Sequence, residues 1–283
     1  MSESQADSPG EYVMIRSKSE GERLDKQYGV WQANTGFLLH PTIAQKQRMR
    51  IADVGTGTGI WLRDLANTLP KNCQLDGFDL SESMFFKDTT IPSNVSFYQH
   101  NLLEPFPTKF IGQYDVVNAR ALVVALSHDE WAPALRNLTT LLQPGGFVQW
   151  LDCSVTDFVV KGATNDQVPT NAERWIELLQ TTANTLGKTP NVASLHGLFQ
   201  KSGLEACQEQ IYQLDNLTVR DVLNSAVLEG IQNFMIAALK IRKFDSVDSV
   251  DQVMEMRMAA EKDLRDLGCW FSYKVYVVVG RKA

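Results

Sequence analysis

The chain has 283 residues, of which 44% are hydrophobic and 21% are charged, and its formal net charge is −6. A dedicated nucleic-acid binder needs a basic face, so this acidic balance argues against that class of protein. No apolar run approaches the roughly 20 residues of a membrane span. The four cysteines lie far apart without a Cys-x-x-Cys pair, which argues against a disulfide framework and a zinc site.

The pattern divides the chain into three parts. Residues 1–10 are polar and acidic, which is typical of a disordered tail. Residues 11–45 predict N-terminal lid helices, and residues 46–283 predict the main domain. Two stretches interrupt the regular pattern of that domain, at 153–190 and 214–265, and we expect them to form cap insertions above the carboxyl edge of the sheet.

The lid region has helical periodicity over residues 20–31. Leu24, Tyr28 and Trp31 recur at a spacing that places them on one helix face. This face either packs on the edge of the sheet or closes over a ligand, with Gln27 and Tyr28 turned toward it. A further helix is predicted between this segment and the first strand.

Residues 50–61 predict an apolar strand, a glycine-rich turn and the start of a helix. Gly55, Gly57 and Gly59 let a ligand approach the backbone, but the last comes one residue too early for the dinucleotide fingerprint. Asp53, at the end of the strand, would repel a pyrophosphate and suits an ammonium group. These features together favour an adenosyl ligand that has an amino-acid arm and no phosphate.

Alternating strands and helices over residues 50–152 predict a parallel sheet with helices on both faces. The second strand, 73–79, ends in Asp79, roughly twenty residues after the glycine-rich turn, where an acid is suited to bind ribose hydroxyls. Leu80 and Met84 follow, and they either pack against an adenine or belong to the core.

The third strand, residues 95–100, is followed by Asn101 and Leu102. The amide oxygen of Asn101 can accept a hydrogen bond from a ligand. The fourth strand ends near Asn118 and Arg120, which places both at the same edge of the sheet as the glycine-rich turn.

The rest of the chain continues this alternation and then becomes more helical. The helix after the fourth strand is expected to end at a Pro-Gly-Gly turn at residues 143–146. In order, the remaining predicted elements are strand 114–120, helix 131–142, strand 147–152, helices 171–186 and 192–201, strand 204–213, helices 217–243 and 253–267, and strand 270–280.

Residues 53–59, Asp-x-Gly-x-Gly-x-Gly, resemble motif I of the class I S-adenosylmethionine-dependent methyltransferases. Tyr-Asp-Val-Val at 114–117 resembles motif IV, and Leu-x-Pro-Gly-Gly at 142–146 resembles a further hallmark of the family. Residues 118–122 do not match the Asn/Asp-Pro-Pro-Tyr of members that methylate DNA or glutamine, which argues against those substrates. The resemblance implies an α/β, Rossmann-like, seven-stranded, mostly parallel sheet with helices on both faces, the last strand antiparallel, and helical cap insertions.

Further segments resemble fungal secondary-metabolite methyltransferases of the gliotoxin-cluster N-methyltransferase type; they are residues 22–28, 38–41, 51–61 and 77–81. This resemblance implies S-adenosyl-L-methionine as cofactor, S-adenosyl-L-homocysteine as product, and a small-molecule acceptor methylated on nitrogen or oxygen. No metal, nucleic acid or membrane partner is expected. We expect a cytoplasmic protein, either a monomer or a homodimer.

The expected cofactor-binding residues are Gln27, Tyr28, Asp53, Gly55, Thr56, Gly57, Gly59, Trp61, Asp79, Leu80, Met84, Asn101, Leu102 and Asn118, and the catalytic candidates are His40, Tyr28, Arg120 and Trp150. His40 is either a base or a packed structural histidine. Arg120 either binds an acidic or carbonyl-bearing substrate or pairs with a lid carboxylate such as Asp25. Trp150 either stacks on the substrate or packs under the cap.

Three other functions fit parts of the pattern. A regulator would bind the cofactor and a protein partner without transferring a methyl group. A non-methylating cyclase would retain the cofactor and release no S-adenosylhomocysteine. An NAD oxidoreductase is the weakest alternative, because the glycine spacing does not fit it.

Overall fold

The computed structural model describes residues 18–85, 91–162 and 168–283. The disordered tail expected at residues 1–10 lies outside these ranges. In chain order the helices and strands are α1 (Lys18–Thr35), β1 (Arg50–Val54), α2 (Ile60–Thr68), β2 (Gln74–Asp79), β3 (Val95–Gln99), β4 (Tyr114–Arg120), α3 (Trp131–Leu141), β5 (Leu142–Cys153), β6 (Val159–Lys161), α4 (Thr170–Thr185), α5 (Leu195–Lys201), β7 (Glu205–Gln213), α6 (Arg220–Ile241), α7 (Val250–Asp266), β8 (Trp270–Ser272) and β9 (Lys274–Arg281). Short 3₁₀ turns lie at Glu82–Met84, Thr108–Phe110, His128–Glu130, Val155–Asp157, Val192–Ser194 and Leu217–Val219.

Seven strands form one mixed sheet in the order β3-β2-β1-β4-β5-β9-β7. β9 runs antiparallel to both of its neighbours, β5 and β7, and the pairs on the other side of β5 are parallel. The predicted sheet of six parallel strands with an antiparallel last strand is therefore confirmed. The strand order changes direction at β1, and ligands of such sheets bind outside the carboxyl ends of the strands at that point.

Helices pack against the sheet as the alternation of elements predicts. α2 contacts β2 and β3, α3 contacts β4 and β5, and α5 contacts β7 and β9. The residues of β1 after Arg50 are buried, which is the pattern of a parallel strand covered on both faces. The core strand therefore places the glycine-rich turn that follows it at a fixed position on the sheet edge.

The single C-terminal strand predicted for residues 270–280 is wrong. β8 pairs with β6 in a separate two-stranded sheet, whereas β9 belongs to the main sheet. The break falls at Tyr273, whose ring stacks on Phe158 with 4.1 Å between centroids and whose carbonyl accepts a hydrogen bond from the backbone N–H of Leu214. Because both halves are apolar and β-branched or aromatic, the composition gives no signal for this break.

The helix expected between α1 and β1 is also absent from this described part of the chain. Residues 36–49 form a loop that packs across the sheet. Its backbone groups are held by a side chain: Gln149 donates to the carbonyl of Leu38 and accepts from the N–H of His40. These bonds give two backbone groups of the loop hydrogen-bond partners without a helix.

The turn expected at residues 143–146 lies inside the start of β5, which begins at Leu142. A register shift between Tyr114 and Val116 accommodates this irregular start. A Cβ added at Gly146 would lie 2.8 Å from the carbonyl oxygen of Tyr114. The glycine is therefore needed for close approach to β4.

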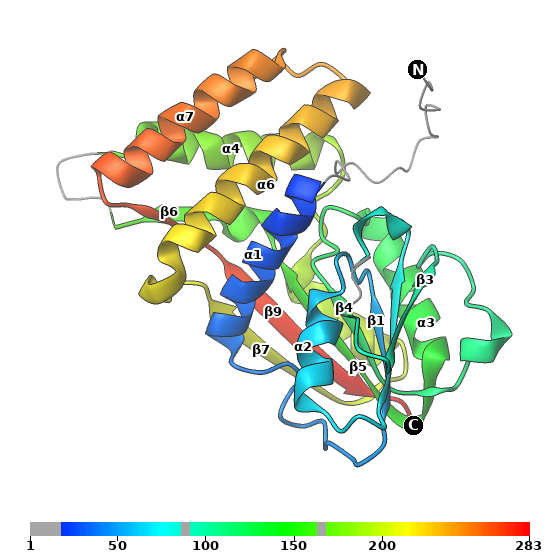
Figure 1. The fold of residues 1–283 in the computed structure, drawn as a ribbon. Coiled ribbons are helices and arrows are strands. Elements are labelled where there is room, and N and C mark those ends of the chain that lie inside the picture. The colour runs from blue at the N-terminus through cyan, green and yellow to red at the C-terminus, as the bar shows by residue number, and fades with distance from the viewer. Residues whose placement is uncertain (1–17, 86–90, 163–167) are drawn as a thin grey trace.

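Helices α4, α6 and α7 gather beyond one end of the sheet, and α1 lies between α6 and the sheet (Figure 1). α4 comes from the first expected insertion, 153–190, and α6 and α7 come from the second, 214–265. The two stretches thus pack together as one helical cap, and α1 joins the cap to the carboxyl edge of the sheet.

One stretch of the described chain, Leu217–Ile241, is long and apolar enough to cross a membrane by length and composition, with a hydropathy of 1.3. Half of the most apolar 18-residue segment of this stretch is buried inside the protein. Within the cap, α6 packs against α1, α4, α7 and β8. These contacts account for its apolar composition as that of a core helix.

Candidate functional site

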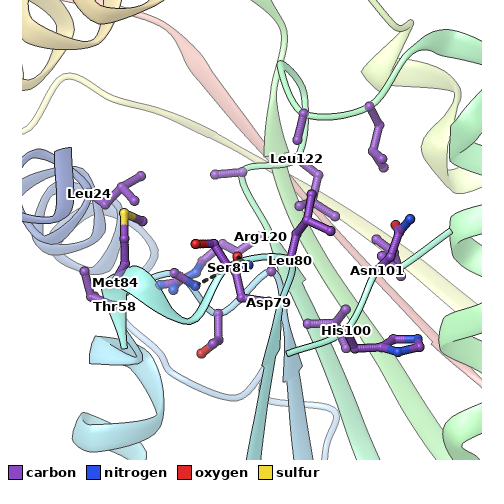
Figure 2. A pocket seen from close by; sticks show the side chains of 18 of the residues that line it. Leu24, Thr58, Asp79, Leu80, Ser81, Met84, His100, Asn101, Arg120 and Leu122 are labelled. Carbon is purple, nitrogen blue, oxygen red and sulfur yellow. Dashed lines mark hydrogen bonds between the residues drawn. The ribbon is translucent and has the colours of Figure 1, made fainter. Parts of the chain in front are cut away.

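A cavity of about 680 Å³ lies at the carboxyl ends of the parallel strands, beside α1. Figure 2 shows Leu24, Thr58 and Met84 at one end of it and His100 and Asn101 at the other. The predicted site residues that line it are Gln27, Tyr28, Gly55, Thr56, Gly57, Asp79, Leu80, Met84, Asn101, Leu102 and Arg120. The structure thus brings together residues that were predicted to bind the cofactor and two of the catalytic candidates, Tyr28 and Arg120.

The glycine-rich turn forms the floor of the cavity. Gly55 and Gly57 have φ angles of 73° and 57°, which side chains with a Cβ rarely adopt. A Cβ on Gly55 would also lie 2.8 Å from Leu122 in the loop after β4. Glycine therefore lets the turn and that loop approach closely and leaves the backbone exposed to a ligand.

Asp53 lies behind this turn and does not line the cavity. Its carboxylate is 0% exposed; one oxygen accepts from Asn118 Nδ2 at 2.7 Å, and the other accepts from the Thr56 hydroxyl at 2.7 Å. Asp53 and Asn118 were both expected to contact the ligand, whereas the structure uses them to hold the turn from below.

The same row of buried polar groups continues across the sheet to His40. Gln149 Nε2 donates to Asn118 Oδ1 at 2.9 Å, and Gln149 Oε1 accepts from the backbone N–H of His40 at 2.7 Å. His40 is 1% exposed, its Nδ1 lies 2.7 Å from the Thr42 hydroxyl, and burial lowers its pKa. His40 does not line the cavity. It is therefore a packed structural histidine, which was the second of the two alternatives. Gln149 was missed, although a polar residue inside an apolar strand was a signal for it.

Gly59, Trp61 and Trp150 also lie outside the cavity lining. Gly59 precedes α2 with a φ of 82°, and the Trp61 indole donates to the carbonyl of Leu38. Trp150 is fully buried and stacks on Trp131 of α3 with 5.1 Å between ring centroids. Trp150 therefore packs against α3, and the alternative in which it stacks on a substrate is not realised.

Asp152 does not line the cavity, but it positions one of the cavity walls. One carboxylate oxygen accepts from the backbone N–H of Leu122 and from the Trp150 indole, at 2.8 and 3.1 Å. The other accepts from the N–H groups of Val123 and Cys153, at 3.2 and 3.0 Å. Burial raises the pKa of Asp152 to about 6. The loop that it holds begins at Ala121, whose φ of 55° is unusual for a residue with a Cβ.

The lid helix α1 closes one side of the cavity, and its cavity-facing residues are Leu24, Gln27, Tyr28 and Trp31. This confirms the face predicted from the helical spacing. Two hydrogen bonds attach the helix to the glycine-rich turn and α2: Asp25 accepts from the Thr58 hydroxyl at 2.6 Å, and the Tyr28 hydroxyl donates to Asp64 at 2.7 Å. Burial raises the pKa of Tyr28, so its hydroxyl stays protonated.

Arg120 brings a positive charge into the cavity. Its guanidinium carbon lies 4.9 Å from the centre of the Tyr28 ring, a distance at which a cation is attracted to the ring face. In the described part of the chain its Nη1 is buried without a hydrogen-bond partner, and it forms no ion pair. The alternative in which Arg120 pairs with Asp25 is therefore not realised, and the guanidinium can receive an anionic group of a ligand.

The far half of the cavity is formed by the ends of β2 and β3. Asp79 accepts from the backbone N–H of Gly57 at 2.9 Å and from that of Ser81 at 3.1 Å, which fixes its carboxylate at the cavity edge. Asn101 Oδ1 accepts from the N–H of Leu103 at 3.1 Å. His100, which was not among the predicted site residues, also lines the cavity.

Several cavity residues were missed because they lie in loops with no motif; they are Leu103, Glu104, Ala121, Leu122, Ala125, Leu126 and Glu130. The four cysteines are unpaired, and no group of three or more metal-ligating side chains occurs in the described ranges.

The arrangement fits an adenosyl ligand with an amino-acid arm. A carboxylate at the end of β2 suits ribose hydroxyls, and the glycine-rich turn admits a ligand to the backbone. Arg120 also lines the cavity, and its Nη1, which has no hydrogen-bond partner in the described ranges, suits a carboxylate. The apolar side chains of Leu80, Met84 and Leu102 also line the cavity and can pack against a base.

Comparison with known proteins points to the same ligand class. A family model described as a methyltransferase domain matches residues 51–146. The methyltransferase grgD of Penicillium is 38% identical over 49% of this chain and 51% of its own length. The N-methyltransferase gliN of Aspergillus fumigatus is 25% identical over 83% of this chain and 84% of its own length. The chain thus spans about half the length of the first relative and most of the second.

A solved structure has the same fold. The methyltransferase bound to the Trm112 activator of Haloferax volcanii superposes with a TM-score of 0.52 at 16% identity, covering 94% of this chain and 98% of that one. Motif I, the strand order and the sequence matches agree. Residues 51–146 therefore match a methyltransferase domain, and the mixed sheet that contains them has the fold of a solved methyltransferase.

Proposed function

We propose that the protein transfers a methyl group from S-adenosylmethionine to a nitrogen of a small-molecule acceptor in fungal secondary metabolism. The observation that carries this proposal is the cavity in which the glycine-rich turn, Asp79 and Arg120 surround one ligand site beneath α1. The name of the relative gliN supports nitrogen as the methylated atom. Methylation of oxygen is the alternative that product analysis distinguishes.

When bound, S-adenosylmethionine supplies a methyl group that its sulfonium charge already activates. The protein's task is then to hold the acceptor in line and to exclude water. Asp79 is placed to bind the ribose, Arg120 to bind the carboxylate of the amino-acid arm, and the α1 face to cover the site. His40 cannot act as a base from its buried position on the far side of Gln149.

The test measures binding and transfer separately. Calorimetry of the purified protein with S-adenosylhomocysteine is expected to show one site, and NAD is expected to show none. Incubation with radiolabelled S-adenosylmethionine and fractionated fungal metabolites is expected to label one small molecule, whose methylated atom NMR then assigns. Binding of NAD instead would contradict the proposal. Cofactor binding without transfer to any fraction would favour a regulator.

Asp79→Ala is expected to weaken S-adenosylhomocysteine binding by more than ~1 kcal/mol, the scale of a hydrogen bond to a charged group. Calorimetry measures the change, and thermal unfolding checks that loss of the bonds to Gly57 and Ser81 leaves the fold intact. Asp245→Ala, at an exposed position in the loop before α7, is the matched control. An unchanged affinity in a folded Asp79→Ala variant would remove Asp79 from the site.

A further inference from the structure

A second, smaller cavity of about 110 Å³ lies beside the first, under the helical cap. Leu24, Gln27 and Ala121 line both cavities. The smaller one, which we call the cap chamber, therefore adjoins the larger one where α1 meets the end of β4. On the proposed function, this is where an acceptor would meet the methyl donor.

The walls of the cap chamber are mainly apolar. Val123 and Val155 contribute from the segments after β4 and β5, and Val227, Ile231 and Phe234 contribute from α6. An apolar protein cavity of about 150 Å³ stays dry and admits a benzene ring. A chamber of this size that adjoins a larger cavity can take one ring or a short branched aliphatic group.

The one charged side chain among the described residues of its lining is already neutralised. Arg23 donates from Nε and Nη2 to the two carboxylate oxygens of Glu20, at 2.9 and 2.7 Å, and from Nη1 to Gln27 Oε1 at 3.0 Å. Asn233 of α6 donates to the same Glu20 carboxylate at 2.7 Å. Each of these groups has its partner within the protein, so the guanidinium is not available as a counter-ion for a ligand.

The two other titratable groups in the lining are neutral. Burial raises the pKa of the Cys153 thiol and of the Tyr273 hydroxyl well above their ordinary values. The Tyr273 oxygen accepts a hydrogen bond from the Trp31 indole at 2.9 Å. No Asp, Glu or His side chain of the described ranges lines the chamber.

We propose that the cap chamber is an acceptor subsite that binds a neutral, apolar group of about one ring and rejects charged groups. A carboxylate or ammonium placed there would lose its hydration without gaining a partner, which is strongly unfavourable. The inference rests on the proposed function, because the acceptor has to reach the donor at the shared wall formed by Gln27 and Ala121.

The test uses three probes of similar shape and different charge with the full chain saturated with S-adenosylhomocysteine. Benzyl alcohol is expected to bind, and benzoate and benzylammonium are expected to bind at least about tenfold more weakly. Ligand-detected NMR or calorimetry measures all three. Val227→Trp is expected to abolish benzyl alcohol binding because the indole fills the chamber, and Ala226→Leu is a milder second variant at the same wall.

Val222→Trp is the matched control, since Val222 lies on the same helix and is 43% exposed. It should leave both S-adenosylhomocysteine and benzyl alcohol binding unchanged. The inference is overturned if benzyl alcohol does not bind, if either charged probe binds equally well, or if the two wall variants keep cofactor affinity and still bind benzyl alcohol normally. A wild-type protein that does not bind S-adenosylhomocysteine would contradict the proposed function instead.

Discussion

Asp152→Asn is expected to lower the free energy of unfolding by roughly 3 kcal/mol, among the larger effects of a single substitution. Each carboxylate oxygen of Asp152 accepts two hydrogen bonds from groups that can only donate: the N–H groups of Leu122, Val123 and Cys153 and the Trp150 indole. An asparagine has one accepting oxygen, so in either orientation its NH₂ group faces two donors. Chemical denaturation measures the loss.

The effect of this substitution should depend on pH in a defined direction. Burial raises the pKa of Asp152 from 3.8 to about 6, so between these values the folded state binds the proton and the unfolded state does not. The stability that this proton uptake adds is therefore fully present below the unfolded pKa and is lost as the pH rises through about 6, whereas the four hydrogen bonds to the carboxylate oxygens remain above that pH. The difference between wild type and variant should be larger at pH 5 than at pH 7.5, by roughly 1 kcal/mol.

Asp245→Asn, an exposed position with the same change of charge, is the control and should change stability little at either pH. A folded Asp152→Asn variant is also expected to bind S-adenosylhomocysteine more weakly, because Leu122 packs against Gly55. If the variant were as stable as wild type at both pH values, the carboxylate would not hold the loop after β4.

The residues that directly follow a strand could be predicted as site residues, because the motif that marks each of them spans only a few neighbouring residues. Gly55, Gly57 and Asp79 each follow directly from a strand end, and the parallel sheet then brings those ends together. The face of α1 was likewise set by helical spacing, with Tyr28 and Trp31 as predicted. The strand at Tyr114–Arg120 was predicted with its observed limits.

The remainder depends on contacts between distant residues, which a single sequence does not reveal. Asp53 and Asn118 stand at the predicted edge, but they bond to each other instead of facing the cavity. His40 was considered as a base because histidine titrates near neutral pH. The hydrogen bond from its backbone N–H to Gln149, which helps to hold it away from the cavity, spans 109 residues of sequence. The division of the C-terminal strand depends in the same way on the contact between Tyr273 and Phe158.

Arg120→Gln is expected to weaken S-adenosylhomocysteine binding by roughly ten- to a hundredfold, the range for losing a charge-assisted hydrogen bond. The reason is that the Arg120 guanidinium lies over the Tyr28 ring with a buried Nη1 that has no hydrogen-bond partner in the described ranges. A carboxylate of the cofactor's amino-acid arm would supply the missing acceptor. Calorimetry on wild type and variant measures the change.

The ligand itself provides the discriminating comparison. 5′-Methylthioadenosine lacks the amino-acid arm, so its affinity should be nearly the same in wild type and Arg120→Gln. Arg48→Gln, which removes an exposed positive charge, should change neither affinity. Equal losses for both adenosyl ligands would mean that Arg120 acts by supporting Tyr28 and α1. If the affinities for S-adenosylhomocysteine and 5′-methylthioadenosine were both unchanged, the Arg120 guanidinium would not bind the carboxylate of the cofactor. It would then be placed to bind the methyl acceptor instead.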